Sequence, residues 1–304
     1  MNRTAVLAAW LFLGGFSCFH LATPPSSKYP VVAELGWIRM RVTDLEKSRR
    51  FYKEILELRE FPKKCFDSEG SCFWVTFGRK IELLPIRDNS ERTGIDEIGF
   101  WAPELDSLRK TLIASGFNPT EIRTDQAKQR FFEVRGPENR LILFFSPSEG
   151  GSQVFSPISQ YLVHTGFVVR NRSAEDRFYK DILGLHLYWQ GGMRDGETDW
   201  VDMQLPPPAN SWVEYMLNVP SSADHRTLGV MNHIALGVPD IHAAEEQLRR
   251  NGWSGNEKPK LGRGGKWQLN LHDPDGTRVE FMEFTPVQKP CCSDYTGPHP
   301  GSKQ

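Results

Sequence analysis

Two histidines and two glutamates in the second half of the sequence are the residues best suited to do chemistry. His164 and His233 each open a strand-like run, and Glu214 and Glu280 lie within two further runs, WVEYML and RVEFMEF. Imidazole and carboxylate groups together suit Fe(II), Mn, Ni or Zn. A single histidine on a strand is more often a core or surface residue than a ligand, so the elements that position these residues decide their meaning.

The composition of the whole chain narrows the class of partner. The 304 residues include 37 Lys and Arg, 38 Asp and Glu, and 39% hydrophobic residues, as in an ordinary two-domain globular protein. A net charge of −1 offers no basic surface for nucleic acid. No apolar run reaches the roughly 20 residues that span a bilayer. We expect a small-molecule partner, no nucleic acid, no membrane span, and a monomer or homodimer.

The N-terminal residues have the layout of a secretory signal. In residues 1–22, Arg3 precedes an apolar run that ends at Phe16 and is followed by small and polar residues. Residues 23–31 then predict a linker. This pattern predicts export, to the periplasm or the extracellular space. A lipid tether at Cys18 is only weakly supported, because the bulky Phe16 lies where small or aliphatic residues are usual.

The remaining cysteines could form disulfides in an exported protein. Cys65 and Cys72 could pair across a short loop, and Cys291 and Cys292 could pair with each other or with another chain. The tail, residues 287–304, is rich in Pro, Gly and Ser and predicts irregular structure. Its CC-x6-H arrangement could bind a soft metal, but two neighbouring thiols in a surface tail are more often incidental.

An internal repeat organises the chain. Residues 37–58 align without a gap with residues 164–185, and residues 98–117 align with residues 234–253. The segment GPENRLILFFSP aligns with DPDGTRVEFMEFTP after one or two inserted residues. The sequence therefore predicts two related halves, which occupy residues 32–150 and 158–286.

Each half divides again into two similar parts. In the stretch before Leu185, the apolar residues Ala174, Phe178 and Ile182 recur at four-residue steps, as in a helix with one buried face. Ser173 precedes this run and could cap the helix. Strand-like runs follow each such stretch. The predicted order is β-α-β-β-β, four times, which makes an α+β fold.

Two motifs in this pattern resemble the vicinal oxygen chelate superfamily, which includes glyoxalase I, extradiol dioxygenases and bleomycin or fosfomycin resistance proteins. They are RFYxxILGL after the first strand and HDPDG-x3-E near the last. The resemblance covers about residues 32–286. It implies that paired β-α-β-β-β modules form two domains of curled sheet, each around a cavity that often holds a divalent metal.

The resemblance also implies which residues hold the metal, because superfamily ligands lie on the first and last strands of the modules. In the second half these positions are His164, Glu214, His233 and Glu280. We expect one divalent metal there: Fe, Mn, Ni or Zn. The same positions in the first half are interpreted as Trp37, Glu82, Glu97 and Ile142. This predicts a degenerate site with Trp37 and Ile142 as core, although Glu82 and Glu97 could bind a hard cation or a basic ligand.

Further cavity residues follow from strand alternation and from composition. If Glu280 faces the cavity, Arg278 and Met282 do so as well. Four aromatic residues are predicted to line the cavity and stack on a flat ligand: Trp200, Trp212, Tyr215 and Trp267. The GRGGK run, residues 262–266, lacks the spacing of a phosphate loop. It predicts a mobile hairpin or lid where Arg263 or Lys266 could meet an anionic substrate.

Three functions are compatible with these residues. The first is that of a glyoxalase-I-like enzyme, and the order His, Glu, His, Glu of the candidate ligands favours it. The resemblance implies that Glu280 or Glu214 moves a proton between adjacent carbons while the metal stabilises enediolate oxygens. That family uses a glutathione adduct, which an exported protein would rarely meet in quantity.

The second function is an extradiol ring-cleaving dioxygenase in which His164, His233 and Glu280 hold Fe(II) or Mn. The chain has Asn270 in the region where that group has an active-site Tyr, and His225 is the candidate acid or base. The third is a non-catalytic binding protein of the resistance type, which would not need an intact ligand set. We therefore expect an enzyme, glyoxalase-like before dioxygenase-like.

Overall fold

The computed structural model describes most of the chain: residues 30–61, 66, 70–76, 79–88, 91–146, 156–159 and 161–301. The predicted signal peptide with Cys18, nearly all of the predicted linker, Cys65 and the last three residues lie outside the described residues. Among the described residues, no helix is both long enough and apolar enough to cross a membrane.

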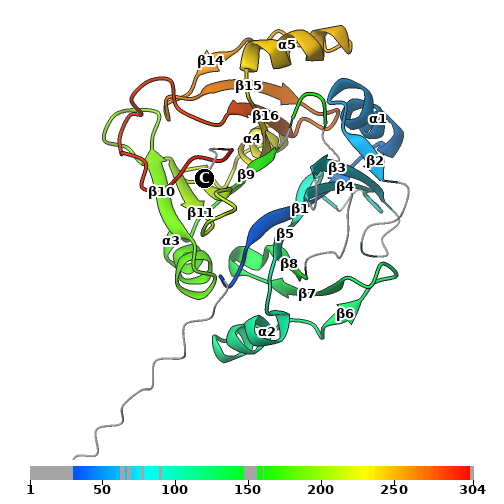
Figure 1. Ribbon diagram of the computed structural model, residues 1–304, viewed down its shortest axis with the longest axis vertical. Coiled ribbons are helices and arrows are strands. Elements are labelled where there is room, and N and C mark those ends of the chain that lie inside the picture. The colour runs from blue at the N-terminus through cyan, green and yellow to red at the C-terminus, as the bar shows by residue number, and fades with distance from the viewer. Residues whose placement is uncertain are drawn as a thin grey trace, which may run out of the picture.

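The first half of the chain forms one eight-stranded sheet with the strand order β2-β3-β4-β1-β5-β8-β7-β6 (Figure 1). Its strands are β1 (Glu34–Val42), β2 (Arg59–Phe61), β3 (Ser71–Thr76), β4 (Arg79–Pro85), β5 (Gly94–Trp101), β6 (Arg123–Thr124), β7 (Arg130–Arg135) and β8 (Leu141–Phe145). Its helices are α1 (Leu45–Arg50), which continues into the π-helix η1 (Phe51–Ile55), α2 (Leu105–Ala114) and the 3-10 helix η2 (Pro137–Asn139).

The second half forms another eight-stranded sheet, with the strand order β10-β11-β12-β9-β13-β16-β15-β14. Its strands are β9 (Tyr161–Val168), β10 (His186–Gly191), β11 (Trp200–Gln204), β12 (Trp212–Met216), β13 (His233–Val238), β14 (Lys260–Leu261), β15 (Trp267–His272) and β16 (Arg278–Glu283). Its helices are α3 (Arg172–Glu175), which continues into the π-helix η3 (Asp176–Ile182), α4 (His225–Met231) and α5 (Ile241–Arg250).

The order of elements confirms the predicted fold class. Each sheet contains two β-α-β-β-β modules, and the strand order of the second sheet repeats that of the first. The first and fourth strands of a module pair in parallel, as β9 does with β12 and β13 does with β16. The first strands of the two modules, β9 and β13, pair with each other in antiparallel. The four strands β12, β9, β13 and β16 therefore lie side by side at the centre of the second sheet.

Local sequence signals set the ends of the helices, with one correction. The helix of the third module begins at Arg172, and Asn171 rather than Ser173 caps it, because the Asn171 side chain accepts a hydrogen bond from the Ala174 amide at 3.1 Å. Ser173 lies inside the first turn. The helix α5 ends before Gly252, whose φ of +94° is a left-handed conformation that suits glycine.

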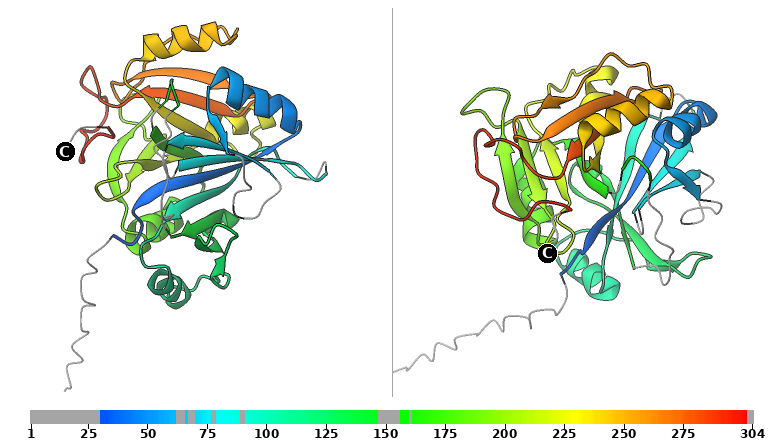
Figure 2. Two further views of the ribbon diagram at one scale, coloured as in Figure 1. Left: turned by 45° about the vertical axis from the view of Figure 1, so that its right-hand side comes forward. Right: turned by 45° about the horizontal axis from the view of Figure 1, so that its top comes forward.

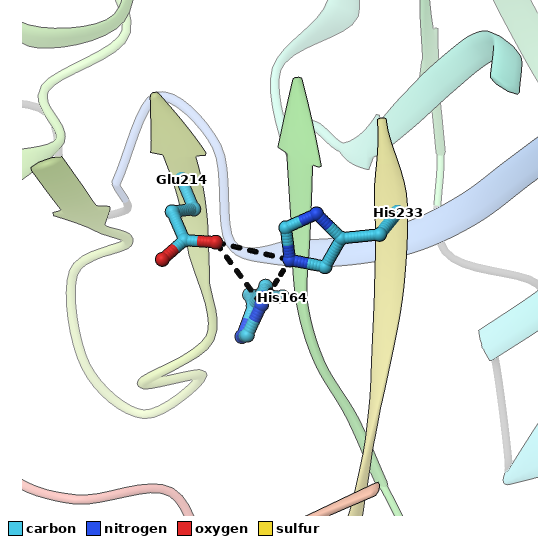
Figure 3. A group of neighbouring side chains, drawn as sticks. All are labelled: His164, Glu214 and His233. Atoms are coloured by element: carbon cyan, nitrogen blue, oxygen red, sulfur yellow. Dashed lines mark hydrogen bonds and ion pairs between the residues drawn. The ribbon is translucent and has the colours of Figure 1, made fainter. Parts of the chain in front are cut away.

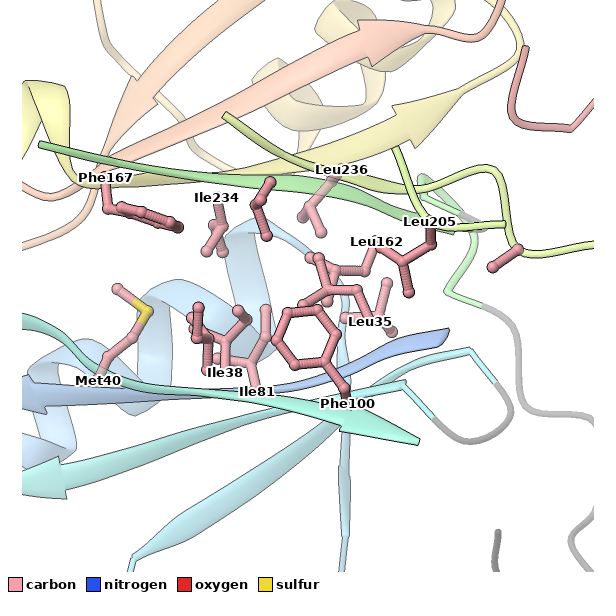
Figure 4. Packing of buried hydrophobic residues seen from close by; sticks show 14 of the residues in the cluster. Leu35, Ile38, Met40, Ile81, Phe100, Leu162, Phe167, Leu205, Ile234 and Leu236 are labelled. Atoms are coloured by element: carbon pink, nitrogen blue, oxygen red, sulfur yellow. The ribbon is translucent and has the colours of Figure 1, made fainter. Parts of the chain in front are cut away.

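The main core lies between the two sheets, which pack face to face (Figures 1, 2 and 4). Side chains from β1 such as Ile38 and Met40 point toward side chains from β9 and β13 such as Phe167 and Ile234. These residues are fully buried, and each buried side chain of this kind stabilises the fold by about 1.5–3 kcal/mol. The period-2 alternation of a strand turns every other side chain away from this core and toward the other face of its sheet.

The other faces of the two sheets are filled differently. On the first sheet this face carries an aromatic cluster that includes Trp37, Phe131 and Phe145, with Phe66 packed against it. On the second sheet a cluster that includes Tyr188, Trp189 and Trp212 borders a cavity of about 400 Å³ in front of the central strands. Among the described residues, the same topology therefore carries a packed aromatic cluster in one half and a cavity in the other.

Candidate metal site

Four neighbouring strands bring the predicted ligands of the second half together. Gly166 of β9 lies opposite Glu214 of β12 and opposite His233 of β13. His164 of β9 and Glu280 of β16 flank one and the same position of β13 from its two sides. Because their side chains leave the sheet on the same face, donors from the first and last strands of two modules meet at one end of the cavity.

Three ligand-type atoms converge within 3.6 Å of one another (Figure 3). The Nε2 atoms of His164 and His233 are 3.0 Å apart, and Oε2 of Glu214 lies 3.0 Å from Nε2 of His233 and 3.6 Å from that of His164. The fourth residue adjoins them, because Oε2 of Glu280 lies 3.9 Å from Nε2 of His233. All four side chains are almost fully buried apart from Glu214, which is 14% exposed.

The polar atoms of this cluster fit a divalent cation better than they fit one another. His164 Nδ1 and Glu280 Oε1 are buried and have no hydrogen-bond partner in the described part of the chain. His233 Nδ1 lies 3.1 Å from the carbonyl oxygen of Met231, to which it can donate, leaving Nε2 free to bind a metal. Burial holds the pKa of both histidines well below the usual value, which favours the neutral imidazole that metals bind. These residues are able to hold a metal such as Zn, Ni, Mn or Fe(II).

Metal binding should be coupled to the release of a proton from Glu280. The pKa of Glu280 is raised to about 7, mainly by burial; Arg278 acts to lower this pKa, and the nearby Glu214 acts in the same direction as burial. The carboxyl group is therefore mostly protonated in the metal-free protein below pH 7 and must lose that proton to become a ligand. We expect affinity for Zn²⁺ to fall about tenfold for each pH unit below 7.

Calorimetry in two buffers of different ionisation enthalpy measures this release directly. At pH 6, about one proton per Zn²⁺ should leave the protein, and Glu280→Gln should abolish that release. Equal proton release by the wild type and Glu280→Gln at pH 6 would contradict the assignment.

Gly166 provides the space that the His233 ring occupies. A Cβ atom at position 166 would lie 2.0 Å from Cε1 and 2.4 Å from Nδ1 of His233. Gly166→Ala should therefore push the imidazole out of the cluster and weaken Zn²⁺ binding by about 10–100-fold, as loss of a group that orients a ligand does. A matched control is Gly99→Ala, whose Cβ would lie 2.7 Å from Cβ of Trp37 in the first sheet. Gly99→Ala should lower the stability of the fold without changing its affinity for Zn²⁺. If Gly166→Ala bound Zn²⁺ as tightly as the wild type, Gly166 would not be needed to make room for the His233 ring.

The cavity is lined by several of the residues that the sequence predicted there. Trp200, Trp212 and Arg263 are among them, and the Trp212 ring stacks on the His164 imidazole at a centroid distance of 4.9 Å. Arg278 and Met282 line the cavity together with Glu280, as the alternation of β16 requires. The cavity therefore has metal-ligand groups at one end and an aromatic wall beside them.

The other predicted cavity residues lie elsewhere. Tyr215 is fully buried in the core between the sheets, where its ring lies 5.9 Å from that of Phe167. Trp267 packs on the same core. Each strand has two faces, and both residues occupy positions that alternate with cavity residues. His225 begins α4 and lies 2.7 Å from Thr93 Oγ1 in a second cleft, between the two halves. These three residues do not line the cavity.

Lys266 is a prominent cavity residue and does not lie on an exposed lid. Its side chain is 1% exposed, and Nζ lies between 4.7 and 5.4 Å from the ring centroids of Trp212, Tyr295 and Tyr188. Burial lowers the pKa of Lys266 to about 7, although nearby carboxylates act in the opposite direction. Residues 262–266 do form the turn of a hairpin, between β14 and β15, and aromatic rings enclose Lys266 on several sides of its ammonium group.

Two further cavity residues were missed by the sequence analysis. Asp202 lies opposite Glu214 in the register of β11 and β12, and burial raises its pKa well above the usual value. The alternation from Trp200 could have found Asp202. Tyr295 belongs to the C-terminal tail, and no period or motif in the tail points to a role in the cavity.

In the first half an arginine lies where the second half has Gly166. Arg39 of β1 lies opposite Glu97 of β5 and Glu82 of β4, the register positions of His233 and Glu214. Arg39 Nε is 2.6 Å from Glu82 Oε2, and Nη1 is 2.6 Å from Glu97 Oε2. The basic partner of the two glutamates is therefore a side chain of the protein itself.

The fourth position of this degenerate site is Leu143, and the assignment of Ile142 is wrong. The strand register puts Leu143 of β8 where β16 has Glu280. Leu143 packs in the cluster that contains Trp37, whereas Ile142 packs in the core between the sheets. A shift of one residue moves a side chain to the opposite face of its strand.

Comparisons with known proteins agree with this architecture. Residues 161–281 match the model of the Glyoxalase/Bleomycin resistance protein/Dioxygenase superfamily. A lactoylglutathione lyase from Haemophilus influenzae is 29% identical over 128 residues, which are 40% of this chain and 91% of that protein.

Solved structures share the fold over nearly the whole chain. A 2,3-dioxygenase from Pseudomonas sp. KL28 has a TM-score of 0.65 at 18% identity, with 88% of this chain and 98% of that one covered. A 2,2',3-trihydroxybiphenyl 1,2-dioxygenase from Sphingomonas wittichii has a TM-score of 0.66 at 14% identity, with 88% and 99% covered. The chain thus has the two-domain fold of the vicinal oxygen chelate proteins, and its second half, residues 161–281, matches the glyoxalase, bleomycin resistance protein and dioxygenase superfamily in sequence.

Proposed function

We propose that this protein is a metal-dependent enzyme of the glyoxalase I type, which acts on a small substrate that chelates through two adjacent oxygens. The observation that carries the proposal is the convergence of two imidazoles and two carboxylates at one end of a cavity. Similarity of the chain to a lactoylglutathione lyase over 128 residues supports it. A cavity of about 400 Å³ is in the range of small-molecule sites.

The proposed reaction needs residues that hold the cation and a base that moves a proton, and this site contains both. His164, His233, Glu214 and Glu280 would hold the cation. When bound, a divalent cation would stabilise negative charge that develops on two adjacent substrate oxygens. Glu280 or Glu214 would take a proton from one of the two adjacent carbons that carry these oxygens and return it to the other. In the metal-free protein burial raises the pKa of Glu280 to about 7, so this carboxylate holds a proton more tightly than an exposed glutamate does.

The first half supports the view that each chain has one such site. Arg39 supplies the positive charge that the two buried carboxylates need there, and the aromatic cluster fills the space in front of the sheet. A cation would have to displace the guanidinium to reach both carboxylates. We therefore assign the metal to the second half alone.

A ring-cleaving dioxygenase is the second candidate, and one observation favours it. Trp212 stacks on His164, and Trp200 also lines the cavity, so aromatic surface is available there for a catechol ring to stack on. Glu214 counts against it, because its Oε2 lies 3.0 Å from His233 Nε2 and adds a fourth donor to the two histidines and Glu280. A binding protein without turnover would have no need for these buried donors.

The test separates the three functions with one protein preparation. Protein purified without chelators should bind about one equivalent of Ni²⁺ or Zn²⁺ and then isomerise 2-oxoaldehyde adducts of several thiols. Thiols other than glutathione are included because the N-terminal residues predict export. Anaerobic loading with Fe(II), followed by catechols and oxygen, should give no yellow ring-opened product.

Each outcome decides between the candidates. A yellow product would favour the dioxygenase, and metal binding with no turnover of either substrate class would favour a binding protein. Less than about 0.2 equivalents of any transition metal after reconstitution would refute all metal-dependent functions.

A further inference from the structure

The C-terminal strap, residues 287–301, has no helix or strand but is held along the second sheet. The Cys291 amide donates to the Arg263 carbonyl at 2.9 Å, and the Thr296 amide donates to the Tyr188 carbonyl at 3.0 Å. Ser293 Oγ accepts from the Gln190 amide. Figures 1 and 2 show this segment, in red, beside β10. The tail predicted to be irregular is thus fixed in place by hydrogen bonds.

The strap forms part of the cavity wall. Tyr295 lines the cavity, its hydroxyl donates to the Gly264 carbonyl at 2.8 Å, and its ring lies over Lys266 Nζ. The indole nitrogen of Trp189, another cavity residue, donates to the Cys291 carbonyl at 3.2 Å. The position of the strap therefore determines how closely this side of the cavity is shut.

A disulfide joins two neighbouring residues at the middle of these contacts. Cys291 and Cys292 are bonded to each other, and Arg263, which lines the cavity, donates to Cys292 Sγ at 3.7 Å. Cys292 is exposed. Its φ of +71° lies in the left-handed region, which residues other than glycine adopt only when their surroundings impose it. The small ring closed by the disulfide is one such constraint.

We propose that Cys291–Cys292 is a reversible redox-modification site whose reduction by a dithiol opens the strap side of the cavity. A thiolate of the dithiol attacks the exposed Cys292 sulfur, the disulfide breaks, and Cys291 leaves as a thiolate that takes up a proton. The second thiol of the dithiol then attacks its own sulfur in the mixed disulfide and releases Cys292. The protein gains two electrons and two protons, and the dithiol becomes a cyclic disulfide.

Reduction removes the ring that holds the Cys292 backbone in the left-handed region. Cys292 can then relax to an extended conformation, which withdraws its sulfur from Arg263 and shifts Cys291 away from the Trp189 indole. Tyr295, three residues further along, loses the anchor on its N-terminal side. The reduced protein therefore has a looser wall around Lys266. This inference concerns the shape of the cavity and does not depend on the reaction proposed for it.

Hydrogen exchange measured by mass spectrometry tests the opening of the strap. Dithiothreitol should speed amide exchange about tenfold or more in residues 287–301 and in β10, and reoxidation should restore the slow rate. Alkylation of the reduced protein should label Cys291 and Cys292. Two further measurements make the test specific to the cavity: the rate at which acetic anhydride acylates Lys266 should rise at least fivefold on reduction, and that of the exposed Lys128 should not change.

Two variants separate this disulfide from other thiol chemistry, because Cys72 is also disulfide-bonded. The double variant Cys65→Ser/Cys72→Ser should respond to dithiothreitol as the wild type does. The double variant Cys291→Ser/Cys292→Ser should exchange rapidly with or without dithiothreitol. The proposal is overturned if the two cysteines resist reduction, if the wild-type strap exchanges equally in both states, or if the response disappears in Cys65→Ser/Cys72→Ser.

Discussion

Replacing His233 by alanine should weaken binding of Zn²⁺ by more than about 100-fold and abolish any metal-dependent turnover. His233 is the centre of the ligand cluster, since its Nε2 lies within 4 Å of His164, Glu214 and Glu280. Even groups that only orient a ligand contribute about 10–100-fold to metal affinity, so removal of a ligand should cost more. Titration of the metal-free protein with Zn²⁺ against a chromogenic chelator measures the effect.

His225→Ala is the matched control for this prediction. His225 is also a histidine of the second half, but it lies at the start of α4 against Thr93 and does not line the cavity. The control should bind Zn²⁺ as the wild type does. If His233→Ala kept wild-type affinity while its circular dichroism spectrum was unchanged, the proposed metal site would be wrong.

Replacing Arg39 by methionine should lower the free energy of unfolding by about 3–5 kcal/mol at pH 8, the usual cost of removing one partner of a buried ion pair. Arg39 contacts two carboxylates, Glu82 and Glu97, that are fully buried on the first sheet. Methionine fills part of the same volume but leaves both carboxylates without the guanidinium. Urea unfolding followed by tryptophan fluorescence measures the loss.

The loss should depend on pH, because burial raises the pKa of both Glu82 and Glu97 to about 7 and Arg39 acts to lower it. These folded-state values lie above the ordinary value of 4.5, so each group makes the fold less stable as the pH rises from about 4.5 through 7. Without Arg39 the two pKa values rise further, and the stability continues to fall above pH 7. The difference in the free energy of unfolding between the wild type and Arg39→Met should therefore be small at pH 5 and largest at pH 8.

Two controls make the Arg39 experiment specific. Adding Glu82→Gln and Glu97→Gln to Arg39→Met should recover part of the lost stability and remove its pH dependence, because neither position then carries a buried charge. Arg123→Met removes an exposed arginine that pairs with Glu133 and should change stability little. A pH-independent loss in Arg39→Met would show that the arginine acts through packing and not through its charge.

Much of the fold was predictable because its signals are local and repeated. The helix that ends in RFYKDILGL has a buried face at helical spacing, and the runs around it alternate at the period of a strand. Four such modules in one chain leave few ways to pair the strands. The predicted ligands were found together for the same reason: each lies on the first or last strand of a module, and those strands are neighbours at the centre of the second sheet.

The errors at the site concern which face of a strand a residue occupies. Tyr215 follows Glu214 directly, so the two side chains leave β12 on opposite faces, and only Glu214 reaches the metal cluster. The assignment of Ile142 in place of Leu143 is an error of one residue in the alignment of the two halves. Such an error places a side chain from the core face of a strand on its opposite face. Alternation along a strand shows which residues share a face, but only the pairing register shows which face points to the cavity and which to the core.

The four β-α-β-β-β modules and the ligand groups of the second half can be predicted from the amino-acid order, because periodicity and residue type are properties of short segments. The folded chain was needed to see that Arg39 occupies the corresponding place in the first sheet, that aromatic rings enclose Lys266, and that the C-terminal strap with its disulfide forms part of the cavity wall. These features join residues far apart in the chain, and their contacts exist only once strand register and sheet curvature are set.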